Sequence, residues 1–213
     1  MTVSATSTSM VDLVPSPDSV MEILKRTGAY RHGHFVYPNG KHASHYFQMP
    51  LAFRYYDNAR ILSVGLSRLF RMEKSIASQL PRVSVISPSP GGIMVAFGVR
   101  EALSAEQIYW AEMEDGKRQF RQYMGESHIH PAIIVDDILR SGRAMQETFD
   151  LCKEIGTEVI GCGVIAKFED AANEFEGIPV KSLLSFDVNF YETEEEWKKS
   201  RSASDAEEEK VRF

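Results

Sequence analysis

Residues 132–145 read AIIVDDILRSGRAM and carry the clearest indication of the fold. Its apolar run, residues 132–135, predicts a buried strand, and two adjacent carboxylates, Asp136 and Asp137, follow that run directly. A polar loop with one glycine comes next, and apolar spacing then predicts a helix over residues 144–155. Because ligands of open α/β sheets bind at the carboxyl ends of the strands, the aspartates and the loop occupy an expected ligand site.

The loop between this strand and this helix, Arg140-Ser141-Gly142-Arg143-Ala144, is called the phosphate loop below. It leads into a helix N-terminus, where free backbone N–H groups and the helix dipole favour an anion. One hydroxyl and two arginines add donors, so the loop can hold a phosphate monoester. Adjacent carboxylates accept hydrogen bonds from a vicinal diol, so pair and loop together favour a ribose 5-phosphate group. A plain strand–turn–helix with solvated aspartates is the alternative.

The flanking segments alternate between strand and helix. The patterns predict strands at 83–86, 107–111, 158–167 and 180–184, and helices at 58–71 and 93–103. This rhythm predicts an α/β fold with a central parallel sheet and helices on both faces. Before it we expect a helix over residues 18–27, capped by Ser16 or Asp18, and a hairpin with a turn at Pro38-Asn39-Gly40.

The composition excludes several classes of protein. The chain has 213 residues, 43% of them apolar, with a formal net charge of −6, so we expect no nucleic-acid partner. No apolar run is long enough for a membrane helix, and the N-terminus has no secretory pattern. Two cysteines, Cys152 and Cys162, make neither a zinc site nor a disulfide framework. We expect a cytoplasmic protein with buried free thiols.

Four segments, in order, resemble one family. The stretch IIVDDILRSGRA resembles the phosphoribosyl-diphosphate (PRPP) motif of type I phosphoribosyltransferases. Residues 33–48 resemble the N-terminal substrate segment of orotate phosphoribosyltransferases, and SPSPGGI at 87–93 resembles their pyrophosphate loop. Residues 111–117, AEMEDGK, are similar to the start of their mobile catalytic loop. The resemblance covers residues 28–184 and implies a type I phosphoribosyltransferase fold with a small N-terminal hood.

The resemblance implies a pentosyltransferase of pyrimidine biosynthesis that transfers ribose 5-phosphate from PRPP to a base, with orotate as the expected base, and releases pyrophosphate. The aspartates would fix the ribose hydroxyls, the phosphate loop would hold the 5-phosphate, and cations at 117–121 would close over pyrophosphate. The implied catalytic residues are Lys117, Asp136 and Asp137, and the implied substrate or PRPP contacts are Lys41, Ser89, Gly91, Gly92, Arg118, Arg121, Arg140, Ser141, Gly142, Arg143 and Ala144.

The resemblance and the composition also indicate the cofactor, the oligomeric state and the domain boundaries. Mg²⁺ is expected mainly through PRPP rather than in a metal site of the chain, although the spacings His32-x-His34 and His128-x-His130 could suit a metal. The family's mobile loop reaches a neighbouring active site, which implies a homodimer. We expect a flexible arm at residues 1–17, a phosphoribosyltransferase domain at 18–190 with its hood at about 18–56, and an acidic polar tail at 191–213.

The chain departs from the family pattern in two places. Arg140-Ser141-Gly142-Arg143 replaces a loop that usually carries two threonines and two glycines, and Met113 stands where the family usually has a basic residue. These departures favour an alternative, a non-catalytic PRPP- or nucleotide-binding regulator on the same fold. Transfer to another base is a third possibility. Residues 112–130 are polar and irregular, which predicts a mobile lid between two core strands.

Overall fold

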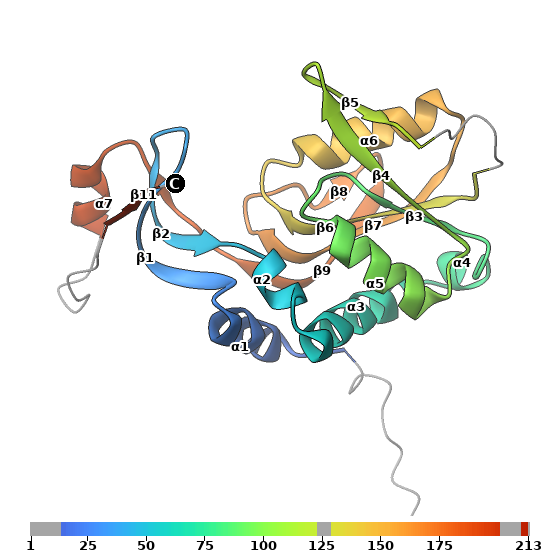
Figure 1. Cartoon of the computed structure of the whole chain (residues 1–213), viewed down its shortest axis with the longest axis horizontal. Helices are drawn as coiled ribbons and strands as arrows, with labels where there is room; N and C mark the ends of the chain where they lie inside the picture. Colours follow the sequence, from blue (N-terminus) through green and yellow to red (C-terminus); the bar gives the residue numbers. More distant parts are fainter. Residues whose placement is uncertain (1–13, 123–128, 201–209, 213) are drawn as a thin grey trace, which may run out of the picture.

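The computed structural model describes residues 14–122, 129–200 and the backbone of 210–212 (Figure 1). The helices are α1 (Pro17–Thr27), α2 (Pro50–Phe53), α3 (Tyr56–Arg71), α4 (Lys74–Ala77), α5 (Ile93–Leu103), α6 (Arg143–Glu154) and α7 (Glu194–Ser200). The strands are β1 (Tyr30–Val36), β2 (His42–Phe47), β3 (Ser84–Ser87), β4 (Gln107–Glu114), β5 (Lys117–Phe120), β6 (Ala132–Leu139), β7 (Val159–Phe168), β8 (Glu174–Phe175), β9 (Ile178–Phe186), β10 (Phe190–Tyr191) and β11 (Lys210–Arg212).

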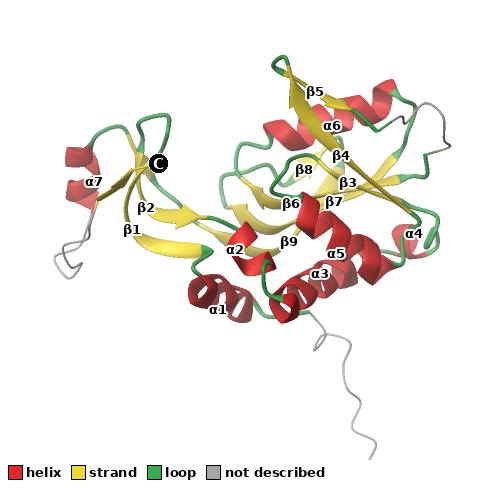
Figure 2. Ribbon diagram, viewed as in Figure 1, coloured by secondary structure: helices red, strands yellow, loops and turns green. Residues whose placement is uncertain are grey.

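The larger sheet has the strand order β5-β4-β3-β6-β7-β9-β8. Its five inner strands run parallel, and β5 and β8 pair antiparallel at the two edges. Helices cover both faces, as Figure 2 shows, with α3 and α5 on one side and α6 on the other. The predicted α/β fold with a central parallel sheet is therefore confirmed.

Strand β6 shows why both faces are covered. Alternate side chains of a strand point to opposite faces, and in the first half of β6 the residues on both faces are apolar. Ile133 and Val135 lie in the cluster that α1, α3 and α5 close, while Ala132 and Ile134 lie in the cluster under α6. All four are fully buried. A strand apolar on both faces is typical of the centre of a parallel sheet.

Predicted elements agree closely with the observed ones in this sheet. Helix α5 spans the predicted residues, and α6 starts one residue earlier than expected. Strand β6 continues to Leu139, past the two aspartates, because its ladder with β7 extends to Leu139↔Lys167. The predicted free thiols are confirmed: both cysteines are buried, and burial raises the pKa of each to about 12.

The expectation of an irregular stretch from residue 112 is wrong up to residue 120. Strands β4 and β5 form an antiparallel hairpin, with Glu114 opposite Lys117. Asp115 and Gly116 join them at φ values of 50° and 76°. Two consecutive positive φ angles make a type I′ turn, for which Asp-Gly is a favoured sequence. Residues 123–128 of the expected lid, with His128, lie outside the described residues.

The expected polar tail also differs from the structure. A second sheet, β10-β2-β1-β11, stands apart from the larger one and is called the hood sheet below (Figure 1). Helix α7 packs on it through Trp197, which is 2% exposed, stacks on His34 at a centroid distance of 3.7 Å and donates to Ser44 Oγ at 2.9 Å. One buried tryptophan anchors this segment, and the acidic average composition concealed it.

The predicted hood, residues 18–56, includes two helices that belong to the main core. Val20 and Leu24 of α1 are fully buried in the cluster of the larger sheet. Ser16 caps α1 by accepting from the Ser19 N–H at 3.2 Å, and Gly28 ends it at φ 73°. Residues 1–13 of the expected arm lie outside the described part of the chain. None of the described helices is long and apolar enough to cross a membrane.

Candidate active site

Asp136 and Asp137 lie in the carboxyl-terminal half of β6 and are 7% and 8% exposed. Asp137 Oδ1 accepts from the Ile138 N–H at 2.8 Å, and Asp136 Oδ1 accepts from the Asp137 N–H at 3.0 Å. Burial raises the pKa of Asp136 well above its ordinary value, and the neighbouring Asp137 carboxylate adds to that rise. Burial likewise raises the pKa of Asp137. The pair is therefore poised to gain from a ligand that brings donors or positive charge.

The pyrophosphate loop, residues 87–93, packs directly on this pair. Ser89 donates its hydroxyl to Asp136 Oδ1 at 2.6 Å, and Ser87 donates to the Ser89 carbonyl at 2.7 Å. A Cβ on Gly91 would lie 2.7 Å from Asp137 Oδ2, and one on Gly92 would overlap Asp136 Oδ1. Only glycines permit this approach, so the loop backbone is held against the carboxyls at the start of α5.

The phosphate loop leads into α6 as predicted. Gly142 caps the helix at φ 75°, and its carbonyl accepts the first helical bond, from the Gln146 N–H at 2.9 Å. A side chain there would also collide with the ring of Phe175. Ser141 Oγ lies 3.5 Å from the Arg143 N–H, at the limit of a hydrogen bond. The N-terminal amides of α6, with Ala144 in its first turn, thus form the anion-binding end.

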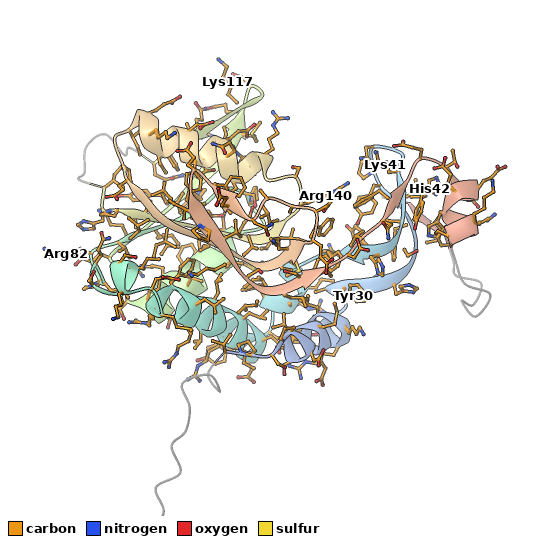
Figure 3. The ribbon with its side chains drawn as sticks, turned by 180° about the vertical axis from the view of Figure 1, so that it is seen from behind. Tyr30, Lys41, His42, Arg82, Lys117 and Arg140 are labelled. Carbon is orange, nitrogen blue, oxygen red and sulfur yellow. The ribbon has the colours of Figure 1, made fainter. Side chains whose placement is uncertain are left out.

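Arg140 points away from the phosphate loop and towards the hood sheet, as Figure 3 shows. Its guanidinium lies over the ring of Phe190 at 4.2 Å and over the ring of Tyr37 at 5.2 Å. Burial raises the pKa of Tyr37 to about 12, although the positive charge of Arg140 acts in the opposite direction. Arg140 therefore ties the phosphate loop to the hood sheet by cation–π contacts.

Among the predicted cations of the hairpin, Arg118 turns inward. Its Nε lies 3.0 Å from Glu147 Oε2, its Nη1 donates to the Pro88 carbonyl, and its side chain is 10% exposed. Arg118 is also the cross-strand partner of Met113. Arg121 is more exposed and lies 3.5 Å from a carboxylate oxygen of Glu112. Lys117 projects from the tip of the hairpin (Figure 3).

Lys41 belongs to the hood sheet's turn rather than to the aspartate cluster. Its Nζ is paired with Glu192 Oε1 at 2.7 Å. The histidines nearby face one another: His34 Nε2 lies 2.7 Å from His42 Nδ1. Among the described residues, no group of three or more histidine, cysteine or acidic side chains is arranged to hold a metal ion.

The structure thus brings together the aspartate pair, Ser89, Gly91, Gly92, the phosphate loop and Arg118. Lys41 and Arg121 instead pair with Glu192 and Glu112, and Lys117 lies at the hairpin tip (Figure 3). The sequence analysis missed Glu147, which binds both Arg118 and Arg143, and the rings of Tyr37 and Phe190. The i, i+4 spacing of Arg143 and Glu147 was a readable signal for an ion pair on one helix face.

The oxygen donors of the aspartate pair fit Mg²⁺ in one specific way. Magnesium commonly uses one or two protein carboxylates and takes its remaining ligands from water and substrate phosphates. Two adjacent buried carboxyls with raised pKa values would be held ionised by such a cation. The pair therefore fits a metal that arrives with a phosphate ligand.

Comparisons with known proteins point to one family. The chain is 30% identical over 176 residues to the orotate phosphoribosyltransferase of Thermotoga petrophila, covering 83% of this chain and 89% of that protein. It is 29% identical over 178 residues to that of Caldanaerobacter subterraneus, covering 84% and 89%. No protein-family model matches the chain.

Solved structures share the fold. The orotate phosphoribosyltransferase of Aeropyrum pernix superposes with a TM-score of 0.64 at 20% identity, covering 78% of this chain and 93% of that chain. An adenine phosphoribosyltransferase from Thermoanaerobacter pseudethanolicus has a TM-score of 0.54 at 12% identity, covering 67% and 88%. The fold is that of the type I phosphoribosyltransferases. Because the sequence relatives and the ordered motifs agree with this fold, the chain belongs to the orotate phosphoribosyltransferase family.

Proposed function

We propose that the protein is an orotate phosphoribosyltransferase, converting orotate and PRPP to orotidine 5'-monophosphate and pyrophosphate. The observation that carries the proposal is the convergence of two anion-binding loops on one buried carboxylate pair. The pyrophosphate loop touches Asp136 and Asp137 from one side, and the phosphate loop follows the same strand. A ligand with a diol between a phosphate and a pyrophosphate matches that arrangement.

The reaction breaks the bond between ribose C1 and the pyrophosphate oxygen and forms a bond from C1 to a ring nitrogen. Positive charge develops on the ribose while negative charge develops on pyrophosphate, so the protein must orient the base and stabilise the leaving group. In our proposal the aspartates accept from the ribose hydroxyls, and the amides from Ser141 to Ala144 hold the 5-phosphate. The backbone from Ser89 to Gly92 approaches the pyrophosphate.

Mg²⁺ is proposed as the cofactor, bound with PRPP, where it would neutralise the pyrophosphate and orient it. Arg118 is the hairpin cation that we expect to help neutralise the pyrophosphate, because it already contacts the Pro88 carbonyl of the pyrophosphate loop. Arg143, at the first turn of α6, is proposed as a second contact. The side chain of Arg140 is proposed to act from the hood side, where it already stacks on aromatic rings.

The protein is proposed to work as a homodimer in which Lys117 and Arg121 serve the neighbouring active site. Lys117 stands at the tip of the β4–β5 hairpin (Figure 3). An apolar groove of about 570 Å³ between α3 and α5 offers contact surface, with Tyr56, Met94 and Phe97 exposed by 76%, 38% and 49%. Apolar side chains gathered in one patch are typical of an interface. Lys41 is proposed to contact substrate after releasing Glu192.

A direct assay tests the activity. The protein is incubated with Mg-PRPP and a panel of bases, and pyrophosphate release is followed, with calorimetric titration of PRPP in parallel. Turnover with orotate above the other bases is the expected result. Tight PRPP binding without turnover on any base would instead support the regulatory alternative. Absence of both, with folded protein, would overturn the proposal. The cytoplasmic location stays a prediction.

Co-expression of two inactive variants tests the shared site. One variant, Lys117→Ala, removes what a subunit supplies to its neighbour's site. The other, the double variant Asp136→Asn/Asp137→Asn, removes what a subunit supplies to its own site. Random pairing restores one complete site in each mixed dimer, so we expect about a quarter of wild-type activity from equal amounts. Activity no higher than the sum of the separate variants, with light scattering at the monomer mass, would contradict the dimer.

A further inference from the structure

Glu147 lies one helical turn beyond the phosphate loop and divides its two oxygens between two arginines. Oε1 accepts from Arg143 Nε at 2.6 Å, and Oε2 accepts from Arg118 Nε at 3.0 Å. Both bonds are charge-assisted and therefore among the stronger hydrogen bonds of the molecule. The hydrogen bond from Arg143, with a smaller contribution from Arg118, holds the pKa of Glu147 below its usual value. This carboxylate joins α6 to the β4–β5 hairpin.

Arg118 carries the connection further, to the pyrophosphate loop. Its Nη1 donates to the Pro88 carbonyl while its Nε stays on Glu147. A planar guanidinium with a fixed fork of donors can bridge two acceptors in this way, whereas an ammonium group is a single point charge. The hairpin, the pyrophosphate loop and α6 are thus connected through one side chain that is 10% exposed.

The register of the hairpin adds an independent observation. Met113 and Arg118 are direct partners across the two strands, so their side chains lie on the same face. Met113 is 51% exposed and uncharged, so on this pair the positive charge comes from β5. Arg118 supplies that charge, and Glu147 and the Pro88 carbonyl both accept its hydrogen bonds.

We infer that Glu147 is a positioning residue, which holds Arg118 against the pyrophosphate loop and Arg143 beside the phosphate loop, so that one cation is fixed near each charged end of the substrate. The inference rests on the proposed function for its substrate and adds the residue that places the charge. Glu147 touches no reacting atom in this account. Its effect on the reaction passes through the two arginines, and through Arg118 above all.

The substitution Glu147→Gln keeps the shape and removes the charge. Because Arg118 contacts the loop already in the ligand-free protein, its loss of position should weaken ground state and transition state alike. We expect KM for PRPP to rise about tenfold while kcat changes less than about threefold. We also expect faster hydrogen exchange over residues 117–120 in the absence of any ligand, because the hairpin loses its anchor.

Glu176→Gln is the matched control. Glu176 lies in the turn between β8 and β9, and its carboxylate pairs at 2.5 Å with Lys153, near the C-terminal end of α6. Removing that charge costs α6 one ion pair but leaves Arg118 and Arg143 in place. KM for PRPP and exchange over residues 117–120 should both stay at wild-type values. A general loosening of α6 would make the two variants behave alike.

A double-mutant cycle shows whether Glu147 acts through Arg118. Arg118→Met should itself raise KM for PRPP, and adding Glu147→Gln should then cost less than about a further twofold. Independent, multiplying effects would overturn the inference, and so would a Glu147→Gln protein that matches the Glu176→Gln control in KM and exchange. If the wild-type protein neither binds nor turns over PRPP, the proposed function fails, and the ligand-free exchange data still decide whether Glu147 anchors the hairpin.

Discussion

The pyrophosphate loop and the phosphate loop, both proposed to bind anions, lie at the same edge of the larger sheet but are built in opposite ways. The pyrophosphate loop turns inward: two glycines let its backbone lie against the aspartate carboxyls, and Ser89 donates to Asp136. The phosphate loop turns its cations outward: Arg140 lies on the rings of the hood sheet, and Arg143 is paired on the surface of α6. One loop is fixed by close packing, and the other is fixed by its arginines.

Because of this difference, we expect the two loops to respond differently to substitutions. A loop held by backbone contact has no room for an added atom, so small changes there are severe. A loop whose side chains are engaged with neighbouring elements transmits changes to those elements instead. The departures from the family pattern fall on the phosphate loop and at Met113 of the hairpin. The added arginines, Arg140 and Arg143, both have partners, the rings of the hood sheet and Glu147.

The largest expected effect is that of Gly92→Ala. Its Cβ would overlap Asp136 Oδ1 and lie 2.7 Å from Ser87 Oγ and 3.0 Å from the Asp136 Cα. Since backbone cannot rotate away, we expect a loss of about 1–3 kcal/mol in the free energy of unfolding. PRPP binding should disappear from calorimetric titration. Gly91→Ala meets only carboxyl atoms of Asp137, which can turn, so a milder loss is expected, and equal losses would contradict the packing argument.

A pH-dependent effect is expected for Asp136→Asn. The pKa of Asp136 is raised in the folded protein, so ionising it costs folding free energy. Its stabilising share is therefore complete below the unfolded pKa of about 4 and is lost as pH rises through the raised folded value. Asn carries no such cost, so the stability of the variant relative to wild type should increase as the pH rises above about 4.

Chemical unfolding at several pH values measures this change, with Ser185→Ala as a surface control. A stability difference that does not depend on pH would contradict the assignment. PRPP binding should move the other way and weaken by about tenfold or more, because a carboxylate acceptor of a charged hydrogen bond is lost. The variant would then be more stable and less active, a common trade at functional sites.

The smallest effect is expected for Arg140→Ala, which releases the phosphate loop from the hood sheet. The cation–π contacts to Phe190 and Tyr37 should be worth about 0.5–2 kcal/mol. Hydrogen exchange over residues 30–47 should quicken, and KM for the acceptor base should rise more than KM for PRPP. Arg140→Lys keeps the charge but loses the planar stack, so its exchange rate and its KM values should lie between those of wild type and Arg140→Ala. An effect confined to PRPP would place Arg140 on the phosphate instead.

The sequence predicted the parts of the site that are local along the chain. Strand, aspartate pair, phosphate loop and helix are consecutive, and the apolar pattern of β6 is readable without any neighbour. The Asp115-Gly116 turn was equally local, and the hairpin could have been predicted from it. By contrast, the contact between Arg118 and Glu147 joins two elements that only the folded sheet brings together.

The hood sheet was the harder part for the same reason. Its hairpin was predicted, but α7 reads as a solvated acidic run because five of its seven residues are charged. Only the stacking of Trp197 on His34, far away in the sequence, shows that this helix covers the hood sheet. Average composition describes a segment's surface, whereas one buried aromatic side chain can fix where the segment lies.

The pairing of β1 with β11 has a consequence for how the protein is made. His34 lies opposite Lys210 in a parallel ladder, so one edge of β1 finds its partner only after the chain has been synthesised as far as residue 210. While the ribosome extends the chain, that edge carries unpaired backbone groups, and exposed strand edges recruit other strands. The nascent protein should therefore be most prone to aggregate before β11 leaves the exit tunnel, and slower synthesis of residues 192–209, just before β11, should lower its yield more than slower synthesis of the larger sheet.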